Sequence, residues 1–222
     1  MTIARRSILG LFAVGAATAL TGCGGGGSDS IPTRFMWVLN LNSEFPSADV
    51  AFGPDPVSSA LPFQALTPRI EVEFGVYSVG LRDRASGRTL YFDGFVVDDY
   101  SPSIEVFYRH GTSARLGASP AGIVNYFESP EALVVELDDG AGSVQTTVLS
   151  FEDSAPQASL SANCRLTVRR ANDGVLVYDS GLRQRTGAIL LFPSDPLIGF
   201  VGALGLNYSG SSAGAVSWPN IL

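Results

Sequence analysis

Short stretches of the chain alternate hydrophobic and polar residues with a period of two. Residues 70–74 place isoleucine, valine and phenylalanine on one face and two glutamates on the other. After Gly75 the parity changes, and Tyr77, Val79 and Leu81 form the apolar set. Because successive side chains of a strand point to opposite faces, these stretches predict half-buried strands, and Gly75 predicts a bulge or sharp bend between them.

Turn residues separate further stretches of the same kind. Residues 104–109 alternate, although Phe107 makes their second face mixed, and residues 165–169 alternate as well. Dipeptides typical of turns follow at positions 86–87, 139–140 and 173–174. No long stretch has helical periodicity, and the chain contains 25 glycines and 13 prolines. These features predict an all-β protein built as an antiparallel β-sandwich.

The two halves of the chain resemble each other. Residues 75–94 align with residues 162–181 at a constant offset of 87, so that Leu90-Tyr91 meets Val177-Tyr178. Residues 38–52 resemble residues 123–137 at an offset of 84 or 85. We predict a tandem duplication with domains at 34–110 and 121–222, joined by a linker at 111–120, each folding separately. The alternative is that any two β-hairpins look alike.

The N-terminal segment predicts export from the cytosol. Arg5 and Arg6 precede thirteen uncharged residues, 8–20, which matches a signal peptide and is too short to span a bilayer. We expect residues 1–22 to be this signal peptide. The arginine pair also resembles a twin-arginine export signal, so the export route stays open.

Leu20-Thr21-Gly22-Cys23 resembles the lipobox of bacterial lipoproteins. The resemblance implies cleavage between Gly22 and Cys23, acylation of Cys23 and anchoring through its acyl chains, with residues 23–33 as the lipidated, Gly/Ser-rich tether. Gly24 follows the cysteine, which in enteric lipoproteins favours the outer membrane over the inner one. The alternative is an ordinary cleaved signal in which Cys23 is incidental.

Two short motifs resemble the bacterial domain-of-unknown-function family 4397. They are a strand passing through a proline-containing loop into a second strand, at residues 40–50, and a Gly-x-Tyr sequence leading a strand, at residues 75–77. The second half departs from them, with Leu133 where Asp49 sits and with Ala162 and Cys164 replacing the glycine and tyrosine. The resemblance implies two tandem immunoglobulin-like sandwiches of a surface or secreted protein, and it brings no functional residues.

Charge narrows the choice of partners. The formal net charge is −7, and removal of residues 1–22 leaves 12 arginines, no lysine and 21 acidic residues. An acidic chain without a basic run is a poor ligand for nucleic acid, and anionic lipid head groups would repel it. We therefore expect no nucleic-acid partner, and contact with the bilayer through the lipid alone.

Cysteine and histidine are too scarce for a transition-metal site. Apart from Cys23, the chain has Cys164 and His110. We predict no metal ion, no cofactor and no catalytic residue, and we place Cys164 in the core in the position that Tyr77 occupies in the first half. His110 follows a strand and could serve as a base or pH sensor, although a solvated turn residue explains it as well.

Three other patterns suggest chemistry, and each has a structural explanation. The sequence 210–214 fits the G-x-S-x-G nucleophile elbow, but no acid or histidine follows it. Asp98-Asp99 and Asp138-Asp139 could bind calcium, although Asp139-Gly140 fits a hairpin turn. Trp37 and Trp218 could stack on a sugar, although the apolar run around Trp37 predicts a buried strand.

The sequence therefore predicts a lipid-anchored cell-envelope lipoprotein, in the outer membrane of a Gram-negative bacterium, that is not an enzyme. The first hypothesis is a binding module for an envelope protein or polysaccharide, with sheet edges or loops as its contact surface. The alternatives are a passive spacer or assembly subunit and, less favoured, a serine hydrolase using the 210–214 motif.

Overall fold

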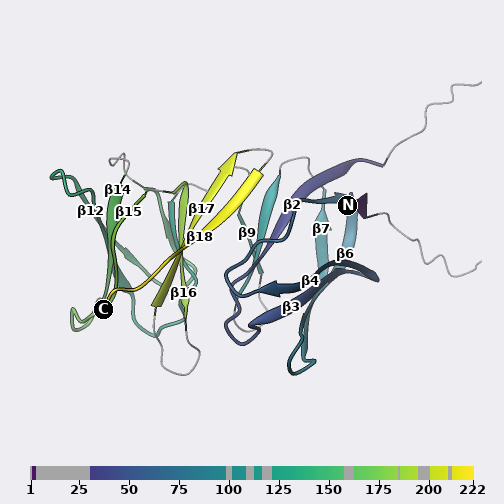
Figure 1. Ribbon diagram of the computed structural model, residues 1–222, viewed down its shortest axis with the longest axis horizontal. Helices are drawn as coiled ribbons and strands as arrows, with labels where there is room; N and C mark the ends of the chain where they lie inside the picture. The colour runs from purple at the N-terminus through teal and green to yellow at the C-terminus, as the bar shows by residue number, and fades with distance from the viewer. Residues whose placement is uncertain are drawn as a thin grey trace, which may run out of the picture.

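The computed structural model (Figure 1) describes residues 2–3, 31–98, 102–108, 113–116, 122–157, 163–184, 186–194, 201–209 and 212–222. Every regular element in these ranges is a β-strand, so the predicted all-β fold is confirmed. Among the described residues there is accordingly no helix that is long and apolar enough to cross a membrane.

The first half of the chain forms two sheets. Sheet A has the strand order β1 (Thr2–Ile3), β5 (Ile70–Glu73), β2 (Thr33–Asn40), β8 (Ser103–Phe107) and β9 (Ser113–Leu116). Sheet B has the order β4 (Asp55–Pro62), β3 (Ser47–Phe52), β6 (Gly75–Asp83) and β7 (Thr89–Val97).

The second half forms two more. Sheet C has the order β13 (Ser154–Ala155), β10 (Gly122–Asn125), β16 (Ala188–Pro193), β17 (Val201–Ser209) and β18 (Ser212–Trp218). Sheet D has the order β12 (Val144–Leu149), β11 (Leu133–Asp138), β14 (Asn163–Arg170) and β15 (Leu176–Gln184). Within the described residues, each strand pair joins strands of the same half.

Most strand pairs are antiparallel, as expected, but β1 pairs with β5, β2 with β8 and β10 with β16 in parallel. The pairs β2–β8 and β10–β16 are parallel because the chain crosses to the facing sheet before it returns beside its starting strand. Gly75 marks one such crossing. Strand β5 ends at Glu73 in sheet A, and β6 begins at Gly75 in sheet B. The change of parity at Gly75 is therefore a change of sheet.

Strand β9 lies inside the segment 111–120 that the sequence predicts to be a linker. It pairs antiparallel with β8, so that Phe107 faces Ser113 and Ile104 faces Leu116. The first half therefore extends at least to residue 116, and part of the expected join is an edge strand of sheet A.

Three apolar clusters hold the four sheets together as successive layers in the order B, A, C, D (Figure 1). The first cluster lies between sheets A and B, and the second lies between C and D. The third lies between sheets A and C and so joins the two halves. Its buried members are Trp37, Leu39, Leu41, Ile104, Val106, Tyr108, Tyr126, Ala188, Leu190, Phe192, Leu204 and Leu206.

Specific contacts accompany this third cluster. The rings of Tyr108 and Tyr126 stack with 4.7 Å between centroids, and the Tyr108 hydroxyl donates a hydrogen bond of 2.5 Å to Glu152. Phe63 and Phe192 meet edge to face at 5.5 Å. Burial raises the pKa of Tyr126, with the nearby Tyr108 and Glu152 adding to the effect. The two halves therefore share a packed interface.

The two halves repeat the same backbone contacts around one asparagine each. The side-chain oxygen of Asn40 accepts a hydrogen bond from the amide of Asn42, and that of Asn125 accepts one from the amide of Phe127, two residues along the chain in each half. Asn40 aligns with Asn125 in these contacts, so the offset in this region is 85, and Asp49 corresponds to Val134 rather than to Leu133.

Candidate functional site

The outward face of sheet B carries a shallow pocket of about 230 Å³, which we call the Tyr91 face. Strands β3, β4, β6 and β7 supply its lining. The lining residues are Asp49, Val50, Ala51, Gly53, Pro56, Ser78, Gly80, Arg82, Thr89 and Tyr91. Because sheet A covers the other side of sheet B, this face is the solvent side of the first half.

Alternation along β7 turns Tyr91 outward. Leu90 and Phe92 pack against the first apolar cluster, so Tyr91 between them faces solvent, with 70% of its surface exposed. Its cross-strand partner is Gly80. A Cβ atom on Gly80 would lie 3.4 Å from the tyrosine ring, so the ring lies against the glycine backbone. Among the described residues, Tyr91 is the aromatic member of the exposed large hydrophobic side chains.

Polar groups surround this ring. Asp49 accepts a hydrogen bond of 2.9 Å from the Ala60 amide, and its carboxylate lies 3.7 Å from the Arg84 guanidinium. Arg82 and Thr89 are cross-strand partners two pairs along from Gly80 and Tyr91, and so lie on the same face of the sheet. The face therefore presents an aromatic surface beside carboxylate, guanidinium and hydroxyl groups that can bond to a polar ligand.

The same face continues along β6 and β7. The Ser78 hydroxyl donates a hydrogen bond of 2.6 Å to Asp93. Beyond this pair, Val76 and Val96 are cross-strand partners and both are exposed. Along the outward side of β6 and β7, the two exposed valines are therefore followed by the hydrogen-bonded Ser78–Asp93 pair and then by Tyr91.

The second half does not reproduce this arrangement, although its sequence aligns Tyr178 with Tyr91. Tyr178 is fully buried in the second cluster, and its hydroxyl donates to the Trp218 carbonyl. The cause is a β-bulge, because β15 has one extra residue between the pairs Arg169–Leu176 and Val168–Tyr178. A one-residue change of register moves each following side chain to the other face.

The tryptophans, Cys164 and the Asp138-Asp139 pair, which the sequence singled out, have structural roles in the fold. Trp37 and Trp218 are both buried, in different clusters, so they do not form a sugar-binding surface. Cys164 is buried in the second cluster, as expected. Asp138 and Asp139 accept hydrogen bonds from backbone amides of residues 140–143 and so close the hairpin between β11 and β12.

The G-x-S-x-G motif is described in part. Ser212, its candidate nucleophile, opens strand β18, whereas a nucleophile elbow needs a turn from a strand into a helix. Gly210 and Ser211 lie outside the described residues, as do Gly22, Cys23, Asp99 and His110. Within the described ranges, no three acidic, histidine or cysteine side chains are grouped as metal ligands.

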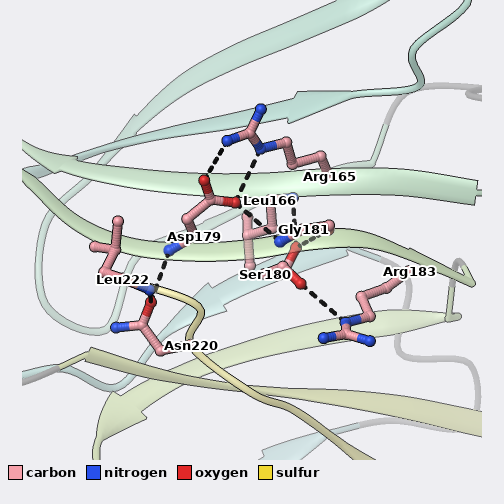
Figure 2. A network of polar contacts seen from close by, with 8 residues as sticks. All are labelled: Arg165, Leu166, Asp179, Ser180, Gly181, Arg183, Asn220 and Leu222. Atoms are coloured by element: carbon pink, nitrogen blue, oxygen red, sulfur yellow. Dashed lines mark hydrogen bonds and ion pairs between the residues drawn. The ribbon is translucent and has the colours of Figure 1, made fainter.

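A second polar site ties the C-terminus to the outward face of sheet D (Figure 2). Arg165 holds the Asp179 carboxylate through two contacts, and the Gly181 amide donates to the same carboxylate at 2.9 Å. The Asn220 side-chain oxygen accepts hydrogen bonds from the amides of Asp179 and Leu222. These contacts fix residues 218–222 against β15, so we assign this site a structural role.

The Asp179 site predicts a specific pH dependence of stability. The hydrogen bonds from Arg165 hold the pKa of Asp179 below its usual range. A lowered pKa stabilises the fold above the pKa of the unfolded chain, about 4, and this contribution is lost as the pH falls through the folded value. We expect Asp179→Asn to cost about 1–2 kcal/mol at pH 7 and the difference from wild type to shrink below about pH 4.

Urea unfolding of both proteins between pH 7 and pH 3 measures this difference. Arg165→Gln serves as the matched variant, because it removes the same interaction from the other side. A difference between wild type and Asp179→Asn that stays constant down to pH 3 would contradict the assignment.

Comparison with known proteins gives no relative: no family model matches the sequence, and a search of the curated proteins finds no match.

Proposed function

We propose that this chain is a non-catalytic, lipid-anchored protein of the cell envelope that binds a carbohydrate polymer at the Tyr91 face. The observation that carries the proposal is the exposed tyrosine ring lying against Gly80 on a sheet face with polar neighbours. The opposite outward face, on sheet D, lacks the aligned aromatic ring because Tyr178 is buried, and its Arg165 and Asp179 pair with each other.

Carbohydrate is the ligand class whose chemistry fits this face. One side of a pyranose ring carries mainly C–H groups and can stack on a flat aromatic ring, whereas its rim carries hydroxyls that need hydrogen bonds. Tyr91 supplies the ring, and Asp49, Arg82 and Thr89 supply polar groups around it. A shallow, open face suits an extended polymer better than a small molecule that must be enclosed.

The anchoring part of the proposal depends on the N-terminal sequence. The lipobox-like residues 20–23 support acylation of Cys23, and Gly24 supports the outer membrane of a Gram-negative bacterium. The repeated contact of the Asn40 and Asn125 side chains with the amide two residues along supports a tandem duplication, with the second half as the diverged copy. We retain the relation to immunoglobulin-like domains of family 4397 as part of this proposal.

A passive spacer or assembly subunit is the second candidate. The third apolar cluster favours it, because a buried interface between sheets A and C makes the two halves a stiff unit. The two functions differ at Tyr91, since a spacer needs no exposed aromatic ring. The serine hydrolase receives no support from the position of Ser212 in strand β18.

Replacement of Tyr91 tests the carbohydrate proposal. We expect Tyr91→Ala to weaken binding to a polysaccharide at least about tenfold. The stacking of a nucleobase on one aromatic side chain contributes roughly 1–3 kcal/mol, and we expect a sugar ring stacked on Tyr91 to contribute an amount in the same range. Tyr91→Phe keeps the ring and serves as the matched control. The assay is an array of bacterial polysaccharides probed with the fluorescently labelled mature chain carrying Cys23→Ala.

Stability must stay constant for this test to report on binding. Because Tyr91 is mostly exposed, we expect Tyr91→Ala to change the free energy of unfolding by less than about 0.5 kcal/mol. Equal binding by wild type and Tyr91→Ala, or an array on which the wild type retains nothing, would contradict the proposal and favour the spacer.

A further inference from the structure

A second pocket, of about 280 Å³, lies at one end of the second half and differs in character from the Tyr91 face. Leu133, Val177 and Val201 line it from β11, β15 and β17, so it opens between sheets C and D. Phe127 adds a fourth apolar side chain, and the polar residues of its lining include Glu131.

The first half fills the equivalent space with a side chain. The shared contact of Asn40 and Asn125 with the amide two residues along sets an offset of 85, which aligns Phe45 with Pro130. Phe45 is buried in the first cluster, with the Arg88 guanidinium 4.9 Å from its ring centroid. Pro130 is exposed and lines the pocket. The pocket therefore lies where the second half has Pro130 in place of the buried aromatic side chain of Phe45.

One polar atom of this pocket's lining has no bonding partner. The Glu131 Oε1 atom accepts a hydrogen bond of 2.5 Å from Asn172, but its Oε2 atom is buried without a hydrogen bond. A buried carboxylate oxygen without a donor is costly, so its presence calls for an explanation. Arg170, which also lines the pocket, pairs with Asp173 at 2.6 Å. A donor group on a molecule bound in the pocket would satisfy this oxygen.

We propose that this pocket binds an alkylammonium group. Its methylene chain lies against Leu133, Val177 and Val201, and its ammonium donates to the Glu131 carboxylate. Such a group belongs either to a lysine side chain of a partner protein or to a free aliphatic amine. A second copy of this chain cannot supply the lysine, because the sequence contains none. This proposal is independent of the Tyr91 face.

Titration with n-pentylamine, followed by NMR on the mature chain carrying Cys23→Ala, tests the proposal. We expect saturable shifts at pocket residues with a Kd of about 1 mM, as befits a ligand of six heavy atoms, and binding of 1-pentanol at least about tenfold weaker. Acetyl-lysine methylamide distinguishes the two sources, because it binds if the pocket accepts a protein lysine and does not if only a free amine fits.

Two variants locate the binding. Glu131→Gln should weaken pentylamine at least about tenfold without changing the affinity for pentanol, whereas Pro130→Phe should place an aromatic side chain there and abolish binding of both. Glu136→Gln, on the outward face of sheet D, is the matched control and should bind as wild type does. Because Glu131→Gln preserves side-chain volume, it keeps the test decisive even if Pro130→Phe fails to fold.

Three results would overturn the proposal. They are the absence of saturable shifts with pentylamine, as expected if ordered water alone satisfies Glu131, equal affinities for pentylamine and pentanol, and unchanged pentylamine binding by Glu131→Gln.

Discussion

Replacement of Leu190 by aspartate is expected to unfold both halves of the chain at a lower urea concentration than in the wild type. Leu190 is fully buried in the third cluster, where β16 of sheet C faces sheet A. Truncation of a buried leucine costs about 2–5 kcal/mol, and an unpaired carboxylate at the same place adds to this cost. The sum is a large fraction of the 5–15 kcal/mol that stabilises a typical domain.

The two tryptophans allow this effect to be followed in each half separately. Trp37 lies in β2 and Trp218 in β18, so Trp218→Phe and Trp37→Phe leave one fluorescent reporter in the first or the second half. We expect the transitions reported by the two proteins to coincide in the parent and to shift together with Leu190→Asp. Val148→Asp, on the exposed face of β12, is the control and should change stability little.

Independent unfolding of the two reporters would contradict this expectation and would agree with the sequence-based prediction that each half folds alone. We now expect the opposite for residues 31–116 expressed by themselves. Separation of the halves would expose the apolar face of sheet A, including Trp37, Leu39 and Val106. A face of this kind promotes self-association, which sedimentation or light scattering would detect.

Cys23→Ala is expected to move the whole protein from the membrane fraction to the soluble fraction. Each buried methylene of an acyl chain contributes about 0.8 kcal/mol, and two chains give stable attachment, so their loss leaves no anchor. Incorporation of labelled palmitate, together with fractionation of the cells, measures the effect. Cys164→Ala is the matched control, since Cys164 is buried in the core and should not affect labelling. Equal label in wild type and Cys23→Ala would discard the lipoprotein assignment.

The period-two pattern predicted the strands because most of them have one face toward a core and one toward solvent. It was incomplete for β8, whose five residues are all buried. Ile104 and Val106 face sheet C, whereas Phe107 faces sheet B, so sheet A is covered on both sides. A pattern within one strand does not say what covers its second face, and the interface between the halves was therefore not predicted.

The candidate site could have been found in part from the sequence. Leu90 and Phe92 alternate with Tyr91, and Val79 and Leu81 alternate with Gly80, so both outward positions follow from parity. The different fate of Tyr178 could not be found in this way, because its burial depends on a bulge that the sequence of β15 does not announce. The replacement of Phe45 by Pro130 is visible in the aligned halves, but the pocket it leaves requires knowledge of the surrounding sheets.

If the chain binds a polysaccharide at Tyr91 as we propose, the burial of Tyr178 limits how strongly a single molecule can hold it. Of the two aligned tyrosines only Tyr91 is exposed, so each chain would engage one segment of polymer at a time. Tight retention then has to come from avidity, through many molecules concentrated in one membrane, because linked weak sites gain effective concentration. The surface density of the protein would accordingly govern how firmly the envelope holds its polymer.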